Sequence, residues 1–160
     1  MSHWLDILED NSTKNTIHDY IFKNEDVPDL KNIYIYKWEI KRDEFEFMEI
    51  VIHFYFPIPK NVNKKVSEKK NVISGNFTLY PIENYNYNYN NLIILENKLE
   101  VFHIELENIP ENKIRILISS NYGNTFKAIA RGVSLLNFGY SLVDSEFFKK
   151  LPSNYYHINK

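Results

Sequence analysis

The chain has 160 residues, of which 44% are hydrophobic and 25% are charged, and its formal net charge is -2. This length suffices for one domain with a substantial core, and the composition is typical of a globular protein. The nearly balanced charge argues against a nucleic-acid partner. Because cysteine is absent, disulfides, thiol catalysis and cysteine-ligated metal sites are excluded.

The N-terminus has no basic segment followed by an apolar run, so the sequence predicts no secretory signal. No stretch approaches the roughly 20 apolar residues that a membrane-spanning helix needs. Together with the lack of cysteine, these features predict a cytoplasmic protein without a membrane partner.

The chain is expected to begin with two short helices, within about residues 3–23. Each has apolar residues at the spacing of one helical face: Trp4, Ile7 and Leu8 in the first, and Ile17, Tyr20 and Ile21 in the second. Ser2 is the expected cap of the first helix. Pro28 ends the helical region, because the residue before a proline is pushed toward an extended conformation.

From residue 32 the hydrophobic period becomes two, which is typical of strands. Residues 33–41 predict a strand with four large side chains on one face: Tyr34, Tyr36, Trp38 and Ile40. Residues 45–56 predict a second strand, whose shared face carries Glu46, Met48, Ile50, Ile52, Phe54 and Phe56. The polar residues between them predict a hairpin with Asp43 and Glu44 at its turn.

The rest of the chain predicts further short strands and few helical residues. A lysine-rich loop over residues 60–71 precedes expected strands at residues 72–80, 92–95, 99–107, 113–119 and 125–136. Pro81 is expected to stop the first of them, and Asp144 or Ser145 to cap a final helical turn. The prediction is one mainly β (α+β) domain over 1–160, an antiparallel β-sandwich or strongly curved sheet at about 32–140, with a helical N-terminus and a short C-terminal tail.

The most distinctive stretch is residues 84–91, where Tyr85, Tyr87 and Tyr89 alternate with asparagines. In a strand alternate side chains share a face, so three phenols are expected on one side and amides on the other. Binding surfaces favour this pairing, because tyrosine offers rigid contact area and asparagine offers adaptable hydrogen bonds. The run predicts a contact surface; the competing interpretation is a low-complexity edge strand or loop without a function.

Acidic residues recur near turns and strand edges, among them Asp43, Glu44, Glu105 and Glu107. One interpretation is a patch that meets a basic protein surface, and the other is an ordinary solvated sheet face. An enzyme centred on His53 and His103 is the weaker alternative, because no ligand spacing, nucleophile motif or phosphate loop accompanies them. The sequence therefore predicts no enzyme, no catalytic or metal-binding residues and no cofactor.

Three segments together resemble the immunity protein 50 family of bacterial polymorphic toxin systems. They are residues 4–8 with 21–22 and 27–30, the proline-rich strand end at residues 56–59, and the strand series over residues 99–140. Residues 61–91, which include the tyrosine run, are outside the resemblance. The resemblance implies a small cytosolic protein that neutralises a cognate toxin by stoichiometric binding, with no catalytic residues of its own.

The sequence thus predicts an immunity protein for a bacterial toxin domain, active in competition between bacteria. The candidate toxin contacts are Tyr85, Tyr87, Tyr89, Asp43, Glu44, Glu105 and Glu107. The alternative function is a carbohydrate- or small-ligand-binding β module that uses the same exposed tyrosines. The expected partner is a protein, and the sequence neither requires nor excludes a homo-oligomer.

Overall fold

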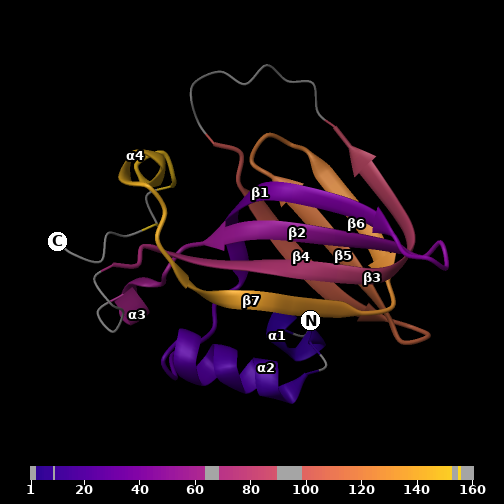
Figure 1. Cartoon of the computed structure of the whole chain (residues 1–160), viewed down its shortest axis with the longest axis horizontal. Coiled ribbons are helices and arrows are strands. Elements are labelled where there is room, and N and C mark those ends of the chain that lie inside the picture. Colours follow the sequence, from indigo (N-terminus) through magenta and orange to yellow (C-terminus); the bar gives the residue numbers. More distant parts are fainter. Residues whose placement is uncertain (1–2, 9, 64–68, 90–98, 153–154, 156–160) are drawn as a thin grey trace.

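A closed, antiparallel β-barrel dominates the computed structural model, which describes residues 3–8, 10–63, 69–89, 99–152 and 155 (Figure 1). The strands are β1 (Leu30–Arg42), β2 (Met48–Phe56), β3 (Val72–Asn88), β4 (Phe102–Ile109), β5 (Lys113–Ser120), β6 (Thr125–Ala130) and β7 (Val133–Ser141). The helical elements are α1 (Trp4–Ile7), α2 (Asn11–Thr16), the π-helical turn η1 (Ile17–Ile21), α3 (Lys60–Asn63) and α4 (Ser145–Phe148). The predicted mainly β fold is confirmed.

Six strands close the barrel in the order β1-β2-β3-β6-β5-β4, and β4 returns to β1. The sheet therefore curves until it closes on itself. Of the two predicted architectures, a β-sandwich and a strongly curved sheet, the structure has the curved sheet, closed into a barrel. The contact between β4 and β1 that closes the barrel is short. Its registered pairs are Leu30 with Ile104 and Ile33 with Phe102. Among the described residues, the second half of β1 pairs with β2 alone.

β3 is much longer than predicted and pairs with three other strands. It does not stop at Pro81 but continues to Asn88, pairing first with β2 and β7 and then with β6. The single strand expected at 125–136 is instead β6 and β7, which follow one another along β3 and are separated at Arg131 and Gly132. Pro81 is tolerated because it lies between the registered pairs of β3 with β7 and with β6, so its missing N–H interrupts neither set; its carbonyl oxygen still accepts a hydrogen bond from the Arg131 amide.

The barrel interior is filled by alternate residues of its strands, as the period of two predicts. The buried set includes Ile50, Ile52, Phe54 and Phe56 of β2, Ile104 and Leu106 of β4, and Ile114, Ile116 and Ile118 of β5. A different pattern occurs in β1, where the register shifts between Ile35 and Lys37. This bulge leaves Tyr34 and Tyr36 outside while Trp38 and Ile40 lie opposite the buried Ile52 and Ile50, so the prediction that all four share a face is wrong.

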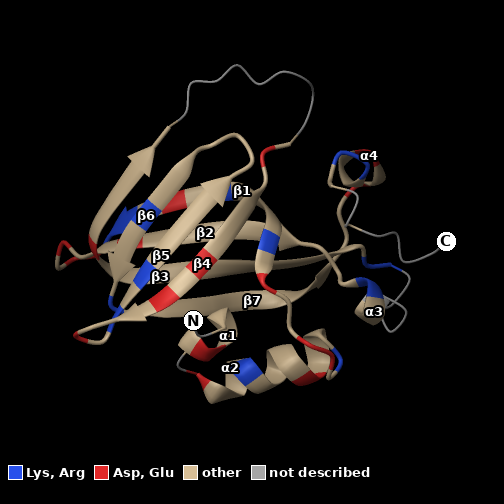
Figure 2. Cartoon of the chain, turned by 180° about the vertical axis from the view of Figure 1, so that it is seen from behind, with Lys and Arg blue, Asp and Glu red and all other residues tan. Residues whose placement is uncertain are grey.

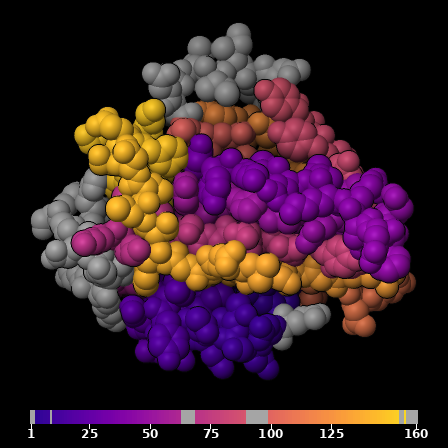
Figure 3. Space-filling model, viewed as in Figure 1, coloured from indigo at the N-terminus to yellow at the C-terminus, as the bar shows by residue number. Residues whose placement is uncertain are grey.

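The N-terminal helices cover the barrel beside β7, as the space-filling view also shows (Figures 1 and 3). Trp4, Ile7 and Leu8 are all buried, which confirms their predicted common face. His3 caps α1 by accepting a hydrogen bond from the Leu5 amide, a role predicted for Ser2, which is outside the described residues.

The second helical segment differs from its prediction at one residue. Ile17 and Ile21 are buried, but Tyr20 is 69% exposed. The turn here is π-helical, and its wider winding moves Tyr20 off the buried face that α-helical spacing predicts.

The C-terminal segment packs against the outside of the barrel. Asp144 caps α4, as predicted, by accepting a hydrogen bond from the Glu146 amide. Phe147 contacts the rings of Tyr34 and Tyr55. The buried Tyr155 hydroxyl donates to the carbonyl oxygens of Asn32 and Tyr55, which anchors the segment. No helix within the described residues has the length and apolar character needed to cross a membrane.

Gly75 of β3 marks the tightest packing between the barrel and β7. An added Cβ would lie 2.9 Å from Phe138 Cδ2 and 3.3 Å from Phe54 Cζ. The Phe138 ring is itself held against Trp4 and Phe22. Gly75→Ala is therefore expected to lower the free energy of unfolding by about 1–3 kcal/mol, measured by denaturant titration.

Gly139→Ala is the matched control, since nothing lies within 4 Å of a Cβ built there. Its effect is expected to stay within about 0.5 kcal/mol. Equal destabilisation by the two substitutions would contradict the close packing described at Gly75.

Candidate protein-binding surface

The structure places Tyr85 and Tyr87 on the inner face of the barrel at one of its ends. They lie opposite Ala128 and Phe126 of β6, both of which are buried. The asparagines at 84, 86 and 88 lie opposite Ile129, Lys127 and Thr125 and therefore face outward. The predicted division into a phenol face and an amide face is confirmed for residues 84–88.

These tyrosines remain accessible although they are on the inner face. Tyr85, Tyr87 and Tyr89 are 46%, 50% and 59% exposed. At this end the barrel wall has a gap between β3 and β2. Beyond Ile82, β3 pairs with β6 on one side, and among the described residues no strand pairs with it on the side of β2. Residues 84–88 of the run are thus part of a strand with an accessible aromatic face, Tyr89 follows directly after it, and residues 90–91 are outside the described residues.

Two further strands add apolar groups to the same region. The Phe126 ring contacts Trp38 at 5.4 Å and stacks on Tyr85 at 6.2 Å between centroids, so it links β1 to β3. Ile40 lies two residues beyond Trp38 on the inner side of β1, and both are exposed. We call the set Trp38, Ile40, Tyr85, Tyr87, Tyr89 and Phe126 the aromatic end of the barrel.

The aromatic end has the properties of a recognition surface. Its rings are fixed on strands and against one another, so little side-chain entropy would be lost on binding. Burial raises the pKa of the Tyr87 phenol further above neutral pH, and a neutral phenol can both donate and accept hydrogen bonds. Large exposed aromatic groups gathered in one place are uncommon on a monomer and mark sites of association.

Asp43, a candidate contact, instead holds the turn between β1 and β2 together. Its Oδ1 accepts hydrogen bonds from the amides of Phe45 and Phe47, each at 2.9 Å, and its Oδ2 accepts one from the Tyr80 hydroxyl. The bond from Tyr80 holds the pKa of the Asp43 carboxyl below its usual value and raises the pKa of the phenol. The Asp43 carboxylate is therefore used within the chain.

The same turn exposes two phenylalanines that the sequence interpretation missed. Residues 45–47 were expected to begin the second strand, but β2 starts at Met48. Phe45 and Phe47 are 71% and 52% exposed, and Glu44 is exposed beside them. Asp43 was the available signal, since aspartate commonly bonds to the backbone amide two residues later and forms a turn. We call residues 43–47 the hairpin tip.

A groove separates the hairpin tip from the tyrosine run. Its volume is about 380 Å³, and it is lined by Arg42, Glu46, Phe47, Met48, Ile82, Glu83, Asn84 and Tyr85. The groove brings the hairpin tip next to the first tyrosine of the run. The hairpin turn and the Tyr/Asn segment, which were predicted separately, thus line the same groove.

Glu105 and Glu107 are not part of that surface. They lie on the outer face of β4, which is turned toward the viewer in Figure 2 and away in Figure 1. Glu105 lies 3.4 Å from His103 Nε2, and Glu107 pairs with Arg115 at 3.1 Å. The structure therefore separates these two carboxylates from the tyrosines with which they were grouped.

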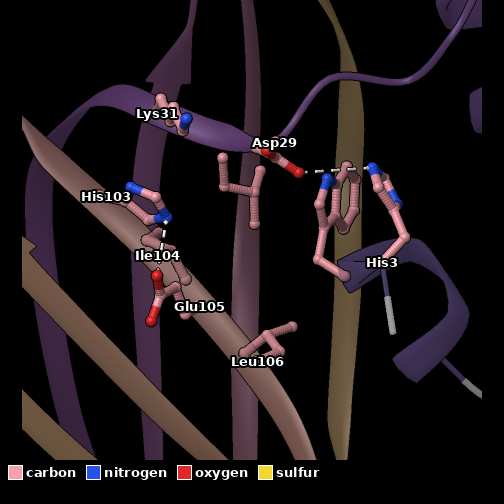
Figure 4. A pocket seen from close by; sticks show the side chains of 9 residues that line it. His3, Asp29, Lys31, His103, Ile104, Glu105 and Leu106 are labelled. Carbon is pink, nitrogen blue, oxygen red and sulfur yellow. Dashed lines mark ion pairs between the residues drawn. The ribbon is translucent and has the colours of Figure 1, made fainter. Parts of the chain in front are cut away.

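The structure does not bring His53 and His103 together. His53 lies on β2, with Nε2 3.7 Å from Glu39, whereas His103 lies on β4, and β1 runs between these strands. His103 instead lines a cavity of about 440 Å³ with His3, Asp29, Lys31 and Glu105 (Figure 4).

In this cavity the carboxylate of Asp29 lies 4.0 Å from His3 Nε2, and that of Glu105 lies 3.4 Å from His103 Nε2. The described residues contain no cluster of three or more potential metal ligands.

Comparisons with protein-family models, curated proteins and solved structures found no match for this chain. The resemblance to an immunity-protein family therefore stays a prediction.

Proposed function

We propose that this chain is an immunity protein that neutralises a bacterial toxin domain by stoichiometric binding through the aromatic end of its barrel. The observation that carries the proposal is the exposed, ordered row of Tyr85, Tyr87 and Tyr89 beside Trp38 and Ile40. Aromatic anchors on rigid strands are the groups that dominate the affinity of protein interfaces. The toxin as partner follows from the family resemblance of the sequence.

The carbohydrate-binding alternative has less support. A sugar needs an accessible ring face, but Tyr85 stacks on Phe126, and Tyr87 and Tyr89 stack on each other at 6.3 Å. In the other tyrosine row, Tyr55 stacks on Tyr34 and Tyr36, and Phe147 contacts Tyr34 at a tilt of 60°. Because the rings of both rows already contact neighbouring rings, fewer free ring faces remain for a sugar than isolated tyrosines would offer.

Co-expression with the toxin domain expected in the neighbouring gene tests the proposal. The chain is expected to restore growth of cells that produce the toxin and to co-purify with it in equal amounts. Failure to protect, with both proteins soluble and present, would contradict the proposed function. Protection without association would also contradict it, because stoichiometric binding is the proposed mechanism.

A further inference from the structure

The hairpin tip exposes more apolar surface than a turn needs. Phe45 is among the most exposed large side chains of the described chain, and Phe47 extends beside it. Phe47 contacts Tyr80 only at its edge, with 6.4 Å between ring centroids. Turns normally carry small or polar residues. Exposure of two phenylalanine rings to water at this position is therefore energetically unfavourable for the unbound protein.

The loop that carries these rings is held in place by several hydrogen bonds. Besides the contacts of the Asp43 carboxylate, the Asp43 amide donates to the Phe47 carbonyl oxygen and the Glu46 amide donates to that of Asp43. Arg42 Nη1 also donates to the Glu46 carbonyl oxygen at 3.3 Å. The rings are thus presented by a preorganised backbone, which lowers the entropy lost when they bind.

The charges around the rings indicate the chemistry of the partner. Residues 41–49 include four acidic side chains and two basic ones. Both basic side chains have contacts within the chain, Lys41 with Glu39 and Arg42 with the hairpin backbone. Glu44 and Glu46 are exposed on either side of Phe45. Arg42, at the base of the tip, keeps its charge, but residues 43–47 themselves carry three acidic side chains and no basic one, so the surface of the tip is apolar with an acidic border.

We infer that the hairpin tip is an anchor that inserts Phe45 and Phe47 into an apolar pocket of the toxin domain, bordered there by lysine or arginine side chains. The inference rests on the proposed function and deepens it by naming the chemistry of the partner's face. The groove beside Tyr85 continues the tip into the aromatic end, so one partner surface can contact both. Complementary charge would mainly accelerate association, whereas the rings would slow dissociation.

The test is the affinity of the full chain for an inactive variant of the toxin domain from the neighbouring gene. The double variant Phe45→Ser/Phe47→Ser is expected to bind about 30-fold or more weakly, chiefly through faster dissociation. The Glu44→Gln/Glu46→Gln variant is expected to associate several-fold more slowly and to depend less on salt concentration.

Tyr20→Ser is the matched control, because Tyr20 is as exposed as Phe45 but lies on η1, which packs beside β7. It is expected to bind like the unaltered chain, and circular dichroism confirms that every variant is folded. Equal affinity of the phenylalanine variant and the unaltered chain would overturn this inference while leaving the proposed function in place. No binding by the unaltered chain would overturn both.

Two further outcomes would assign the tip to another partner and overturn the inference. One is a dimer of the unaltered chain that the phenylalanine substitutions dissociate, measured by sedimentation. The other is sedimentation with phosphatidylcholine vesicles that the same substitutions abolish.

Discussion

Replacement of Tyr85, Tyr87 and Tyr89 together by alanine is expected to weaken binding to the toxin domain about 100-fold or more. The three rings supply much of the exposed surface of the aromatic end, and aromatic anchors typically contribute about 2 kcal/mol or more each, without strict additivity. The melting temperature is expected to change little, because all three side chains are about half exposed. Titration calorimetry gives the affinity, and differential scanning calorimetry gives the melting temperature.

The asparagines of the same strand provide the control for this triple substitution. Asn84, Asn86 and Asn88 alternate with the tyrosines and face the outside of the barrel. Their replacement by alanine is expected to leave the affinity within a few-fold of the unaltered chain. An unchanged affinity together with a lowered melting temperature in the tyrosine variant would instead assign the tyrosines to the core.

Trp4→Ala is expected to lower the free energy of unfolding by about 3–5 kcal/mol. Trp4 is buried between the helical segment and the barrel, where it contacts Phe77 and Phe138 edge-on. Its indole Nε1 also donates to the Pro28 carbonyl oxygen at 2.8 Å. The substitution therefore removes both packing and a hydrogen bond where the N-terminus is attached, and denaturant titration measures the loss.

Trp4→Phe separates the two contributions. Phenylalanine retains much of the ring packing but leaves the Pro28 carbonyl oxygen without the indole donor. Its expected cost is smaller, about 1–3 kcal/mol. A loss below about 1 kcal/mol for the alanine variant would show that the helical segment contributes little to the stability of the barrel.

The strands that pair regularly with their neighbours were predicted from the sequence. In β2 and β5 the predicted inward residues, Ile50, Ile52, Phe54 and Phe56 and Ile114, Ile116 and Ile118, are all buried, although Val51 between Ile50 and Ile52 is buried as well. The cap at Asp144 was predicted for a similar reason, since it depends on local residue chemistry.

The structure differs from the prediction where the backbone changes its period or its pairing partner. A bulge in β1 reverses the faces after Ile35, and a π-helical turn moves Tyr20 outward. β3 passes through Pro81 because its partner changes there from β7 to β6. Each of these depends on contacts between residues far apart in the sequence, which a hydrophobic period does not report.

The candidate site was predicted in part. The alternation of Tyr85, Tyr87 and Tyr89 specified their common face, but not that this face continues into Trp38 and Ile40 of a strand 45 or more residues earlier. Asp43 was predicted both at the hairpin turn and as a contact; the structure shows that its carboxylate bonds to the backbone of that turn, and its role as a contact stays a prediction. Glu105 and Glu107 were grouped with the turn on charge alone, and closure of the barrel places them on another face.

A calorimetric titration of the purified chain with the inactive toxin domain from the neighbouring gene decides whether the chain inhibits the toxin by stoichiometric binding. Saturation is expected at one toxin per chain with a dissociation constant in the nanomolar range, as for a well-anchored protein interface. The variant lacking the three tyrosines is expected to remain unsaturated at the same concentrations. Saturation by that variant with unchanged affinity, or no binding by the unaltered chain, would contradict binding through the aromatic end.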